Sequence, residues 1–431
     1  MAKARILRFL TTLLCAALLF PAGGCVYTGG SQNNVEERET KTLTMWKFRS
    51  NKEDYVLYRW VKQWNEENPY LQVDLEVIPY NDYLTTHLPA AFATASGPDI
   101  YMISAGGFLK YAAAGYMYPL DDYISEELRS DFSPESLNAV TYQGQILGIP
   151  IEREPLALFY NQDMFCHAHL DPPATWEDLV NCAKALQTDA VSGICLPTQI
   201  NDYQNFIFEA FLIQVISRQD SQTLLTEFQQ GGAQVLALWR ELQKYNYVPE
   251  SSQQSSSDIY PLATGKTAMQ VCGLWAVGTL EKYYENLDYG VIPIPTAENG
   301  VSATLYGGWC QAVNPYSELR DQAAQFTLWM WGQDASRPLE WCVEASTKVP
   351  ARNSIIYENQ HVFYSNHYSL FVKEILPTAI AEPRYPVQIA NIISGALQDA
   401  MYTDKDIDTQ IAPIAQRKID SYVRSHPEYF Q

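Results

Sequence analysis

The chain has 431 residues, too many for one ordinary hydrophobic core and enough for two domains. It carries 49 acidic against 29 basic residues, a formal net charge of −20 at neutral pH. A protein this acidic is repelled by nucleic acid phosphates and by anionic lipid surfaces. The charge therefore argues against a nucleic-acid-binding protein.

The first 24 residues predict an export signal. Lys3, Arg5 and Arg8 give a cationic start, an apolar stretch covers residues 9–20, and small residues at 22–24 precede Cys25. The apolar stretch is shorter than the roughly 20 residues that a bilayer-crossing helix needs. We therefore expect residues 1–24 to be a cleaved signal peptide.

The sequence that ends at Cys25 resembles the lipobox of bacterial lipoproteins, although Ala22 stands where that motif usually has Leu. The resemblance implies that Cys25 carries lipid and holds the protein at the extracellular face of the bacterial cell membrane. Residues 28–34 are rich in Gly, Ser, Asn and Gln, a flexible composition. Residues 25–40 are thus expected to form a lipid-anchored linker, and ordinary cleavage with a free N-terminus is the alternative.

Six further cysteines are scattered along the chain with no CxxC pair. Disulfides are permitted outside the cell, but a chain of this size does not depend on them. We expect buried thiols that behave as small apolar residues. These cysteines are Cys166, Cys182, Cys195, Cys272, Cys310 and Cys342.

Strand and helix patterns alternate from residue 42 onward. Residues 43–48 and 71–77 predict strands, and apolar residues between them recur at helical spacing, after a capping-box pair at Ser50 and Glu53. Residues 100–103 are a continuous apolar strand, as in parallel sheets. This order predicts an α/β fold, a parallel sheet with helices on its faces. Strand-like segments at 146–151 and 156–160 begin a second unit, which we expect to include helices at 205–215 and 223–245.

Several segments, in order, resemble the family 1 extracellular solute-binding proteins of ABC importers. They include SGPDIYMISAGGFLKYAAAGYMYPLDDYI, YQGQILGIPIEREPLALFYNQDMF, GKTAMQVCGLWAVG and YGGWCQAVNPYS, and the resemblance extends from residue 42 to the C-terminus. It implies a two-lobe, periplasmic-binding-protein-like (type II) clamp, each lobe a mostly parallel sheet flanked by helices. The implied N-lobe is 41–151 and 295–333, and the implied C-lobe is 152–294 and 334–431.

The same resemblance implies a function without chemistry. The protein is expected to capture a carbohydrate, in the form of an oligosaccharide, between its lobes and to deliver it to ABC permease subunits. It is expected to act as a monomer that needs no cofactor. Polyols, glycerol phosphates and short peptides are the alternative ligands, since related clamps bind them.

Three tryptophans and a serine end predicted strands or stand beside glycines. In open parallel sheets, ligands bind at the carboxyl ends of strands, where Trp46 and Ser104 stand. Trp275, in GLWAVG, stands where many family members have a ligand-stacking aromatic residue, and Trp309 follows two glycines that let backbone approach closely. Aromatic rings can stack on the apolar face of a sugar. We expect these residues to line the cleft, with core or edge packing as the alternative for each tryptophan.

Further segments offer partners for sugar hydroxyls. Glu152 and Glu154 lie at the first crossing between lobes, on one side of an extended segment, and a hinge ion pair with the arginine between them is the alternative. Asn201 and Tyr203 fit a family loop that reaches the ligand, with a polar turn as the alternative. Arg352, in VPARNS, is expected to bind ligand or to cap a helix.

No motif of catalysis or metal binding stands out in the sequence. HExxH and GxSxG are absent, and ATGKT at 263–267 lacks the earlier glycine of a phosphate-binding loop. Cys166, His167 and His169 form one small cluster with metal-ligand chemistry, for which we expect a surface loop and no metal. The rival interpretation is an exported glycoside hydrolase with two carboxylates across a cleft.

Overall fold

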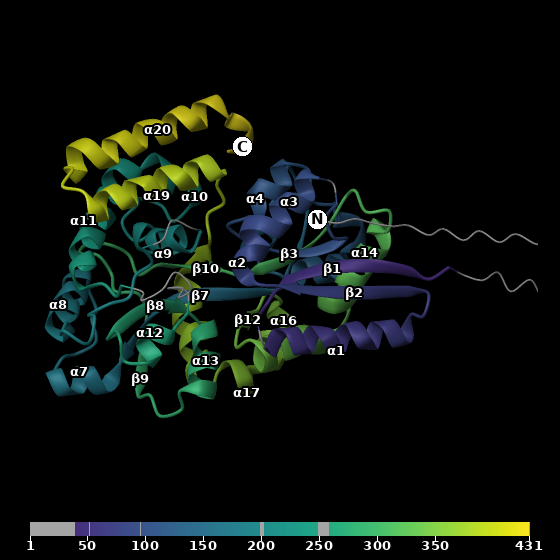
Figure 1. The fold of residues 1–431 in the computed structure, drawn as a ribbon, viewed down its shortest axis with the longest axis horizontal. Helices are drawn as coiled ribbons and strands as arrows, with labels where there is room; N and C mark the ends of the chain where they lie inside the picture. Colours follow the sequence, from purple (N-terminus) through teal and green to yellow (C-terminus); the bar gives the residue numbers. More distant parts are fainter. Residues whose placement is uncertain (1–38, 51, 95, 199–201, 249–257, 431) are drawn as a thin grey trace, which may run out of the picture. The chain divides into compact units, whose positions relative to one another are not determined.

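The computed structural model describes residues 39–430 except 51, 95, 199–201 and 249–257 (Figure 1). The segment Thr40–Gln431 forms one unit, which contains all the elements below. The predicted signal peptide, most of the linker and Cys25 lie outside the described residues. Within the described part, no helix combines the length and the apolar character that a membrane span requires.

Five strands form a first sheet in the order β2–β1–β3–β11–β6. β1 is parallel to β2 and β3, whereas β11 is antiparallel to both β3 and β6. The three strands predicted at 43–48, 71–77 and 100–103 are therefore present, with the predicted helix between the first two. The strands are β1 (Lys41–Phe48), β2 (Leu71–Ile78), β3 (Ile100–Ser104), β6 (Ile149–Pro150) and β11 (Trp309–Val313).

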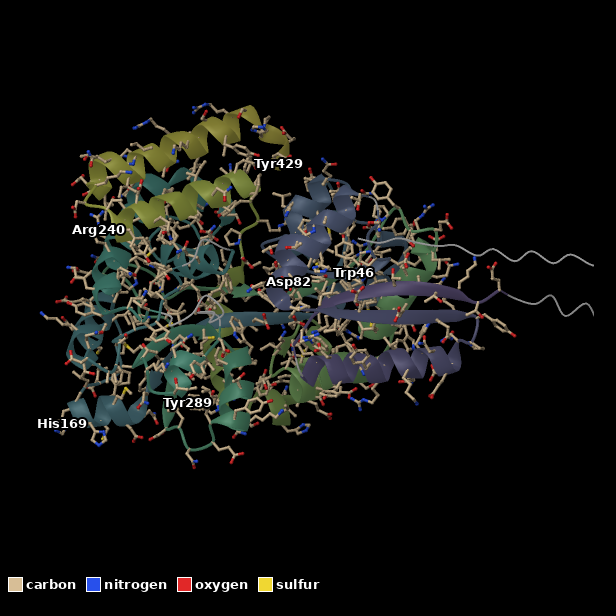
Figure 2. The ribbon with its side chains drawn as sticks, viewed as in Figure 1. Trp46, Asp82, His169, Arg240, Tyr289 and Tyr429 are labelled. Atoms are coloured by element: carbon tan, nitrogen blue, oxygen red, sulfur yellow. The ribbon has the colours of Figure 1, made fainter. Side chains whose placement is uncertain are left out.

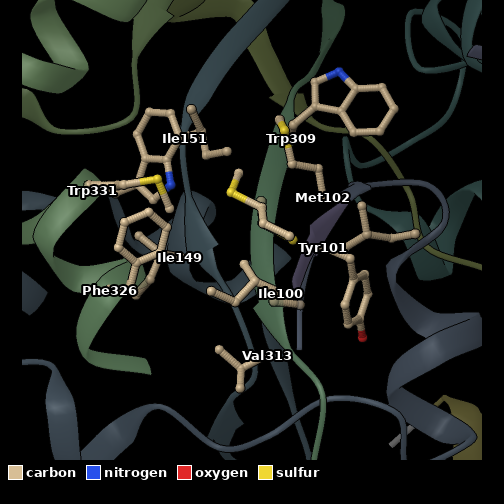
Figure 3. Close-up of a cluster of buried hydrophobic side chains, with 14 of the residues drawn as sticks. Ile100, Tyr101, Met102, Ile149, Ile151, Trp309, Val313, Phe326 and Trp331 are labelled. Atoms are coloured by element: carbon tan, nitrogen blue, oxygen red, sulfur yellow. The ribbon is translucent and has the colours of Figure 1, made fainter. Parts of the chain in front are cut away.

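Helices pack on the first sheet and complete its core. Figure 3 shows Phe326 and Trp331 against Ile149 and Ile151 in this core. The indole N–H of Trp331 donates to the amide oxygen of Gln311 on β11, so its one polar group is satisfied inside the core. The helices of this region are α1 (Lys52–Glu67), α3 (Leu88–Ala93), α4 (Phe108–Ala113), α5 (Glu126–Asp131), α6 (Pro134–Ala139), α14 (Arg320–Leu328) and α15 (Ser336–Glu340).

A second sheet is built around β7, a ten-residue strand that is buried throughout. β7 pairs with β12 and β10 near its start and with β8 and β9 further along, and β10 also pairs with β13. The strands are β7 (Glu152–Asn161), β8 (Met269–Gly273), β9 (Tyr289–Ile292), β10 (Thr304–Gly307), β12 (Val349–Pro350) and β13 (Ala379–Ala381).

Alternate residues of β7 enter two different cores. Leu156 and Leu158 belong to a cluster with the buried residues of α9, α11 and α19, whereas Ala157 and Phe159 belong to a second cluster with α12, α13 and α16. Because successive strand residues point to opposite faces, β7 lies between two layers of helices. This arrangement explains why its sequence is continuously apolar rather than alternating.

The helices on the second sheet come from two stretches of chain. α19 and α20 pack side by side at the C-terminal end (Figure 1). The predicted helix at 223–245 is divided, because Gly231 and Gly232 lie in a π-helical turn (Phe228–Gly232) between α10 and α11. The helices are α7 (Gln162–Ala168), α8 (Trp176–Leu186), α9 (Asp202–Leu212), α10 (Ser221–Thr226), α11 (Ala233–Leu242), α12 (Tyr260–Ala263), α13 (Trp275–Tyr283), α16 (Asn353–Glu358), α17 (Gln360–Phe363), α18 (Asn366–Leu370), α19 (Val387–Tyr402) and α20 (Ala412–Ser425).

The predicted α/β class is confirmed, but both sheets are mixed rather than mostly parallel. In the first sheet, two of the four pairings of named strands are parallel and two are antiparallel. In the second sheet, all four named partners of β7 run antiparallel to it, whereas β10 and β13 form a parallel pair. An isolated parallel bridge also joins Cys195 to Gln270 on β8. A buried strand reads as a continuous apolar run whatever the direction of its neighbours. The apolar pattern of residues 156–160 therefore carried no information on strand direction.

The chain passes between the two sheets at closely spaced points. Ile151 joins β6 to β7, and Gly308 joins β10 of the second sheet to β11 of the first. Glu152 and Glu154, which the resemblance places at the first crossing between lobes, lie at the start of β7 just after Ile151. The predicted lobe boundaries stay a prediction, but β10 lies in the second sheet although it follows residue 295, and Trp341 lies in the first core although it follows residue 333.

All six cysteines outside the signal and linker region are free thiols, and five of them are buried as expected. Cys166, on α7, is exposed. Burial raises the pKa of Cys195 to about 12 and that of Cys182 to about 11, so these thiols stay protonated and unreactive at neutral pH.

The crossing at Gly308 depends on glycine. Its φ is +143°, and a Cβ there would lie 2.2 Å from the carbonyl oxygen of Glu152. We expect Gly308→Ala to lower the free energy of unfolding by about 1–3 kcal/mol from backbone strain alone, measured by urea denaturation. Gly395, exposed on α19 with no atom near its Cβ position, is the matched control. Gly395→Ala should raise stability by about 0.5–1 kcal/mol. Equal stability of Gly308→Ala and the wild-type protein would contradict the role of Gly308.

Candidate ligand-binding site

A cavity of about 600 Å³ opens between residues of the two sheets. This volume lies in the range typical of small-molecule sites. Its lining from the first sheet, α1 and the segments next to them includes Phe48, Ser50, Glu53, Tyr80, Ser104 and Trp309. Its lining from the second sheet and its helices includes Glu154, Tyr203, Trp275, Gly307, Lys348 and Glu382.

Trp309 forms one aromatic wall of the cavity. Its ring centroid lies 4.2 Å from that of Phe48 and 6.3 Å from that of Tyr80. Trp309 begins β11 directly after Gly308, so the crossing strand itself positions the indole.

Trp275 forms a second aromatic wall, at the start of α13. Its ring packs edge-on against Tyr203, with centroids 6.4 Å apart. A Cβ at Gly273 would lie 1.7 Å from the Trp275 ring, so the indole folds back over the end of β8. Gly273, the first residue of GLWAVG, is therefore required for the position of this ring.

Lys348 and three carboxylates form a buried charge cluster beside the cavity. The Lys348 Nζ lies 2.9 Å from Glu154 Oε1, 3.2 Å from Glu53 Oε1 and 3.4 Å from Glu152 Oε1. Glu53 comes from α1, and Glu152 and Glu154 come from β7. The ammonium therefore ties the first lobe's helix to the strand that begins the second sheet.

Lys47 extends this cluster behind the cavity. It is fully buried and lies 3.0 Å from both Glu53 and Asp54, and its ammonium also donates to the carbonyl of Phe48. Glu53 thus lies between two lysines. Four carboxylates surround two ammonium groups, so the cluster carries excess negative charge when every group is ionised.

This environment lowers the pKa of Glu53 and raises that of Glu152. Burial raises the pKa of Glu53, but Lys348, Lys47 and a hydrogen bond from Ser50 outweigh it and lower the pKa to about 2. Burial, together with repulsion from Glu154 and Glu53, raises the pKa of Glu152 to about 8, against the opposing effect of Lys348. The Glu152–Glu154 pair thus holds a proton at neutral pH, which reduces the excess charge.

Thr347 has an unusual backbone conformation next to Lys348. Its φ is +53°, in the left-handed region that β-branched residues rarely adopt. Gly278 on α13 leaves room for it, because a Cβ at Gly278 would lie 2.4 Å from the Thr347 hydroxyl. The strained turn delivers the Lys348 side chain to the carboxylates, as strained residues at binding sites often do.

Five of the predicted site residues line the cavity, and three others do not. Ser104, Glu154, Tyr203, Trp275 and Trp309 line it together, and Asn201 lies outside the described residues. The remaining three, Trp46, Glu152 and Arg352, are absent from its lining.

These three residues have structural partners elsewhere. Trp46, on β1, packs against the first core. Glu152 is buried behind Trp309, whose backbone N–H donates to it at 3.2 Å. Arg352 precedes α16 and donates to Asp131 at 2.7 Å.

The structure excludes the hinge ion pair that was the alternative role for Glu152 and Glu154. Arg153 donates to the carbonyl of Pro350 and to Asn353, on the side of β7 opposite Glu152 and Glu154, as strand alternation predicts. The ion pairs of the two glutamates are made with Lys348 instead.

The capping-box interpretation of Ser50 and Glu53 was wrong. The Ser50 backbone N–H donates to Asp54, at 3.2 Å to each carboxylate oxygen, and not to Glu53. Glu53 turns inward to the lysines, while its carboxylate accepts from the Ser50 hydroxyl.

Sequence reasoning also missed Lys348 and Glu382 as lining residues. Nothing near Lys348 in the sequence pairs with it, since its three carboxylates lie about 200 to 300 positions away. The one available signal was the family segment around VPARNSI, which begins one residue after Lys348.

No group of three or more His, Cys, Asp or Glu side chains with metal-site geometry occurs among the described residues. Cys166, His167 and His169 are exposed on or just after α7, and His169 projects away from the rest of the domain (Figure 2).

The cavity, its two aromatic walls and the two linked sheets define a solute-binding protein, and the family comparison agrees. Residues 59–356 match the model of the bacterial extracellular solute-binding protein family. This chain belongs to that family.

The relatives are distant, and they differ in how much of the chain they cover. A binding protein of Brucella abortus is 23% identical over 382 residues, covering 84% of this chain and 88% of its own length. The maltotriose-binding protein of Pyrococcus abyssi is 25% identical over 217 residues, covering 49% of this chain and 45% of its own length.

Solved structures share the two-lobe fold. A solute-binding protein of Thermotoga lettingae, bound with α-D-tagatose, superposes with a TM-score of 0.77 at 21% identity, covering 89% of this chain and 99% of that one. The maltotriose-binding protein of Thermus thermophilus superposes with a TM-score of 0.72 at 20% identity, covering 88% of this chain and all of that one.

Replacing Lys348 by an uncharged residue should strongly destabilise the protein. We expect Lys348→Met to lower the free energy of unfolding by about 3–5 kcal/mol, because it leaves Glu152 and Glu154 buried without an ammonium group and Glu53 with that of Lys47 alone. Urea denaturation at pH 7 measures the loss. Lys62→Met, which removes an exposed i,i+4 pair with Glu66, is the control and should stay close to wild-type stability. Similar stabilities of the two variants would show that the cluster contributes little.

The cluster should also give the protein a distinctive pH dependence. Glu152 has a raised folded-state pKa, so its stabilising contribution is complete below its ordinary pKa near 4.5 and is lost as pH rises toward 8. Between pH 5 and pH 8, we expect wild-type stability to fall by at least about 1.4 kcal/mol more than that of Glu152→Gln, whose side chain cannot ionise. Parallel stability curves for the two proteins would exclude Glu152 as the titrating group.

Proposed function

We propose that this protein captures a carbohydrate in the cavity and presents it to the permease subunits of an ABC importer. The observation that supports this most directly is the pairing of two indoles, Trp275 and Trp309, with a buried carboxylate, Glu154, in one cavity. Indoles suit the apolar faces of sugar rings, and a carboxylate suits their hydroxyls. The sugar ligands printed for the Thermotoga, Thermus and Pyrococcus proteins support the same class.

The proposed mechanism is lobe closure on a ligand that touches both sheets. Trp309 belongs to the first sheet, whereas Trp275 and Glu154 belong to the second sheet and its helices. A ligand that contacts all three residues binds the closed arrangement better than an open one, and it shifts the population accordingly. The closed protein, as a monomer, then docks on the permease.

Lipidation of Cys25 completes the proposal. The tether would keep the receptor at the outer face of the membrane, close to the permease, and so raise its effective concentration there. The linker at 25–40 would let it reach the transporter.

A glycoside hydrolase fits the cavity less well. Such an enzyme needs an acid and a second carboxylate on either side of the scissile bond. Glu53 and Glu154, the two buried carboxylates in the lining, both bind Lys348, which occupies the space between them. We therefore propose capture without catalysis.

A thermal-shift and calorimetry screen of the mature protein against mono- and oligosaccharides tests this function. A bound sugar at a hundred times its dissociation constant should stabilise the fold by about 2.7 kcal/mol, a shift of a few degrees in Tm. Trp275→Ala should weaken binding of that sugar at least about tenfold. Tyr357→Ala, exposed and away from the cavity, is the control and should not change affinity. A folded protein that binds no sugar but binds a polyol, a glycerol phosphate or a peptide would replace the proposed ligand class.

A further inference from the structure

The charged residues of the cavity fall into two zones. Arg49, Asp258 and Lys282 are exposed at its rim. Further in, the lining carries the carboxylates of Glu53, Glu154 and Glu382 and the ammonium of Lys348. The inner lining therefore holds three acidic groups against one basic group.

The one inner cation is fully engaged. An ammonium group has three donors, and Lys348 has carboxylate oxygens of Glu53, Glu152 and Glu154 within 3.4 Å. Lys47, behind the wall, is fully buried and bound to its own partners. An anionic ligand that reached the inner end would have to displace a carboxylate to find a positive charge there.

Glu382 brings a carboxylate to the seam between the sheets. A Cβ added at Gly106, just after β3, would lie 2.4 Å from Glu382 Oε1. A Cβ added at Gly307, the last residue of β10, would lie 3.5 Å from Glu382 Oε2. The two glycines, one from each sheet, thus leave room for this side chain, which is half-buried and lines the cavity.

We infer that the inner end of the cavity selects a sugar unit that presents hydroxyl or ammonium donors, and rejects sugars that carry a carboxylate or a sulfate. Glu154 and Glu382 are the selecting residues. An ionised carboxylate only accepts hydrogen bonds, and charge-assisted bonds from donors are strong. A second anion placed against these groups, away from water, lacks compensation. This inference rests on the proposed function and narrows its ligand class.

Matched sugars that differ in one group give the test. The mature protein is titrated calorimetrically with glucose, glucosamine and glucuronic acid, with the corresponding mannose series, and with β-1,4-linked trimers of each. In any series that binds, we expect the neutral or the amino member to bind at least tenfold more tightly than the uronate. The tighter of these two members identifies which donor the inner end prefers.

Two variants test whether the carboxylates of the cavity cause the discrimination against uronates. Glu382→Gln removes the charge with little change in shape and should reduce the uronate discrimination severalfold, and Glu154→Gln provides a second, independent variant. Glu374→Gln, exposed and outside the lining, should leave discrimination unchanged.

The outcomes separate the two proposals. A wild-type protein that binds a uronate as tightly as its neutral match overturns the inference and leaves carbohydrate capture standing. Unchanged discrimination in folded Glu382→Gln and Glu154→Gln also overturns it. A folded protein that binds no carbohydrate overturns the proposed function, and the inference with it.

Discussion

The site depends on one buried ammonium group. Lys348 follows a strained threonine, and it binds a carboxylate from α1 and two from β7 in a buried region beside the cavity. Such a cluster is expensive to desolvate and gains its stability only from accurate geometry. That requirement fixes the position of the helix of one sheet relative to the first strand of the other, at the place where the cavity forms.

The aromatic walls are held by the same framework. Glu152 accepts hydrogen bonds from the backbone of Trp309 and from the indole of Trp341, so the charge cluster and the ligand-facing tryptophan share one residue. Gly308 allows its segment of the chain to approach the backbone of Glu152 closely. Glu152 therefore links the charge cluster to Trp309 by a direct hydrogen bond.

Sequence reasoning found the α/β class, the family and the first four elements, because these depend on local periodicity and on recognisable segments. It also placed five residues in the cavity, since strand ends and glycine-flanked tryptophans are local signals. It missed Lys348 and Glu382, whose roles arise from contacts across hundreds of positions. It assigned Glu53 to a helix cap because spacing alone does not say which way a side chain turns. The direction of the partners of β7 was equally invisible, because a strand buried on both faces has the same composition in either sheet type.

The five buried thiols are most open to oxidation before the protein has folded. A member of an extracellular family folds where oxidants are present, and every cysteine of the nascent chain is then open to chance pairing. In the folded protein, burial withdraws Cys182, Cys195, Cys272, Cys310 and Cys342 from that chemistry. Folding must therefore bury these thiols before oxidants reach them. Among the described residues, the thiol that stays exposed afterwards is that of Cys166 on α7.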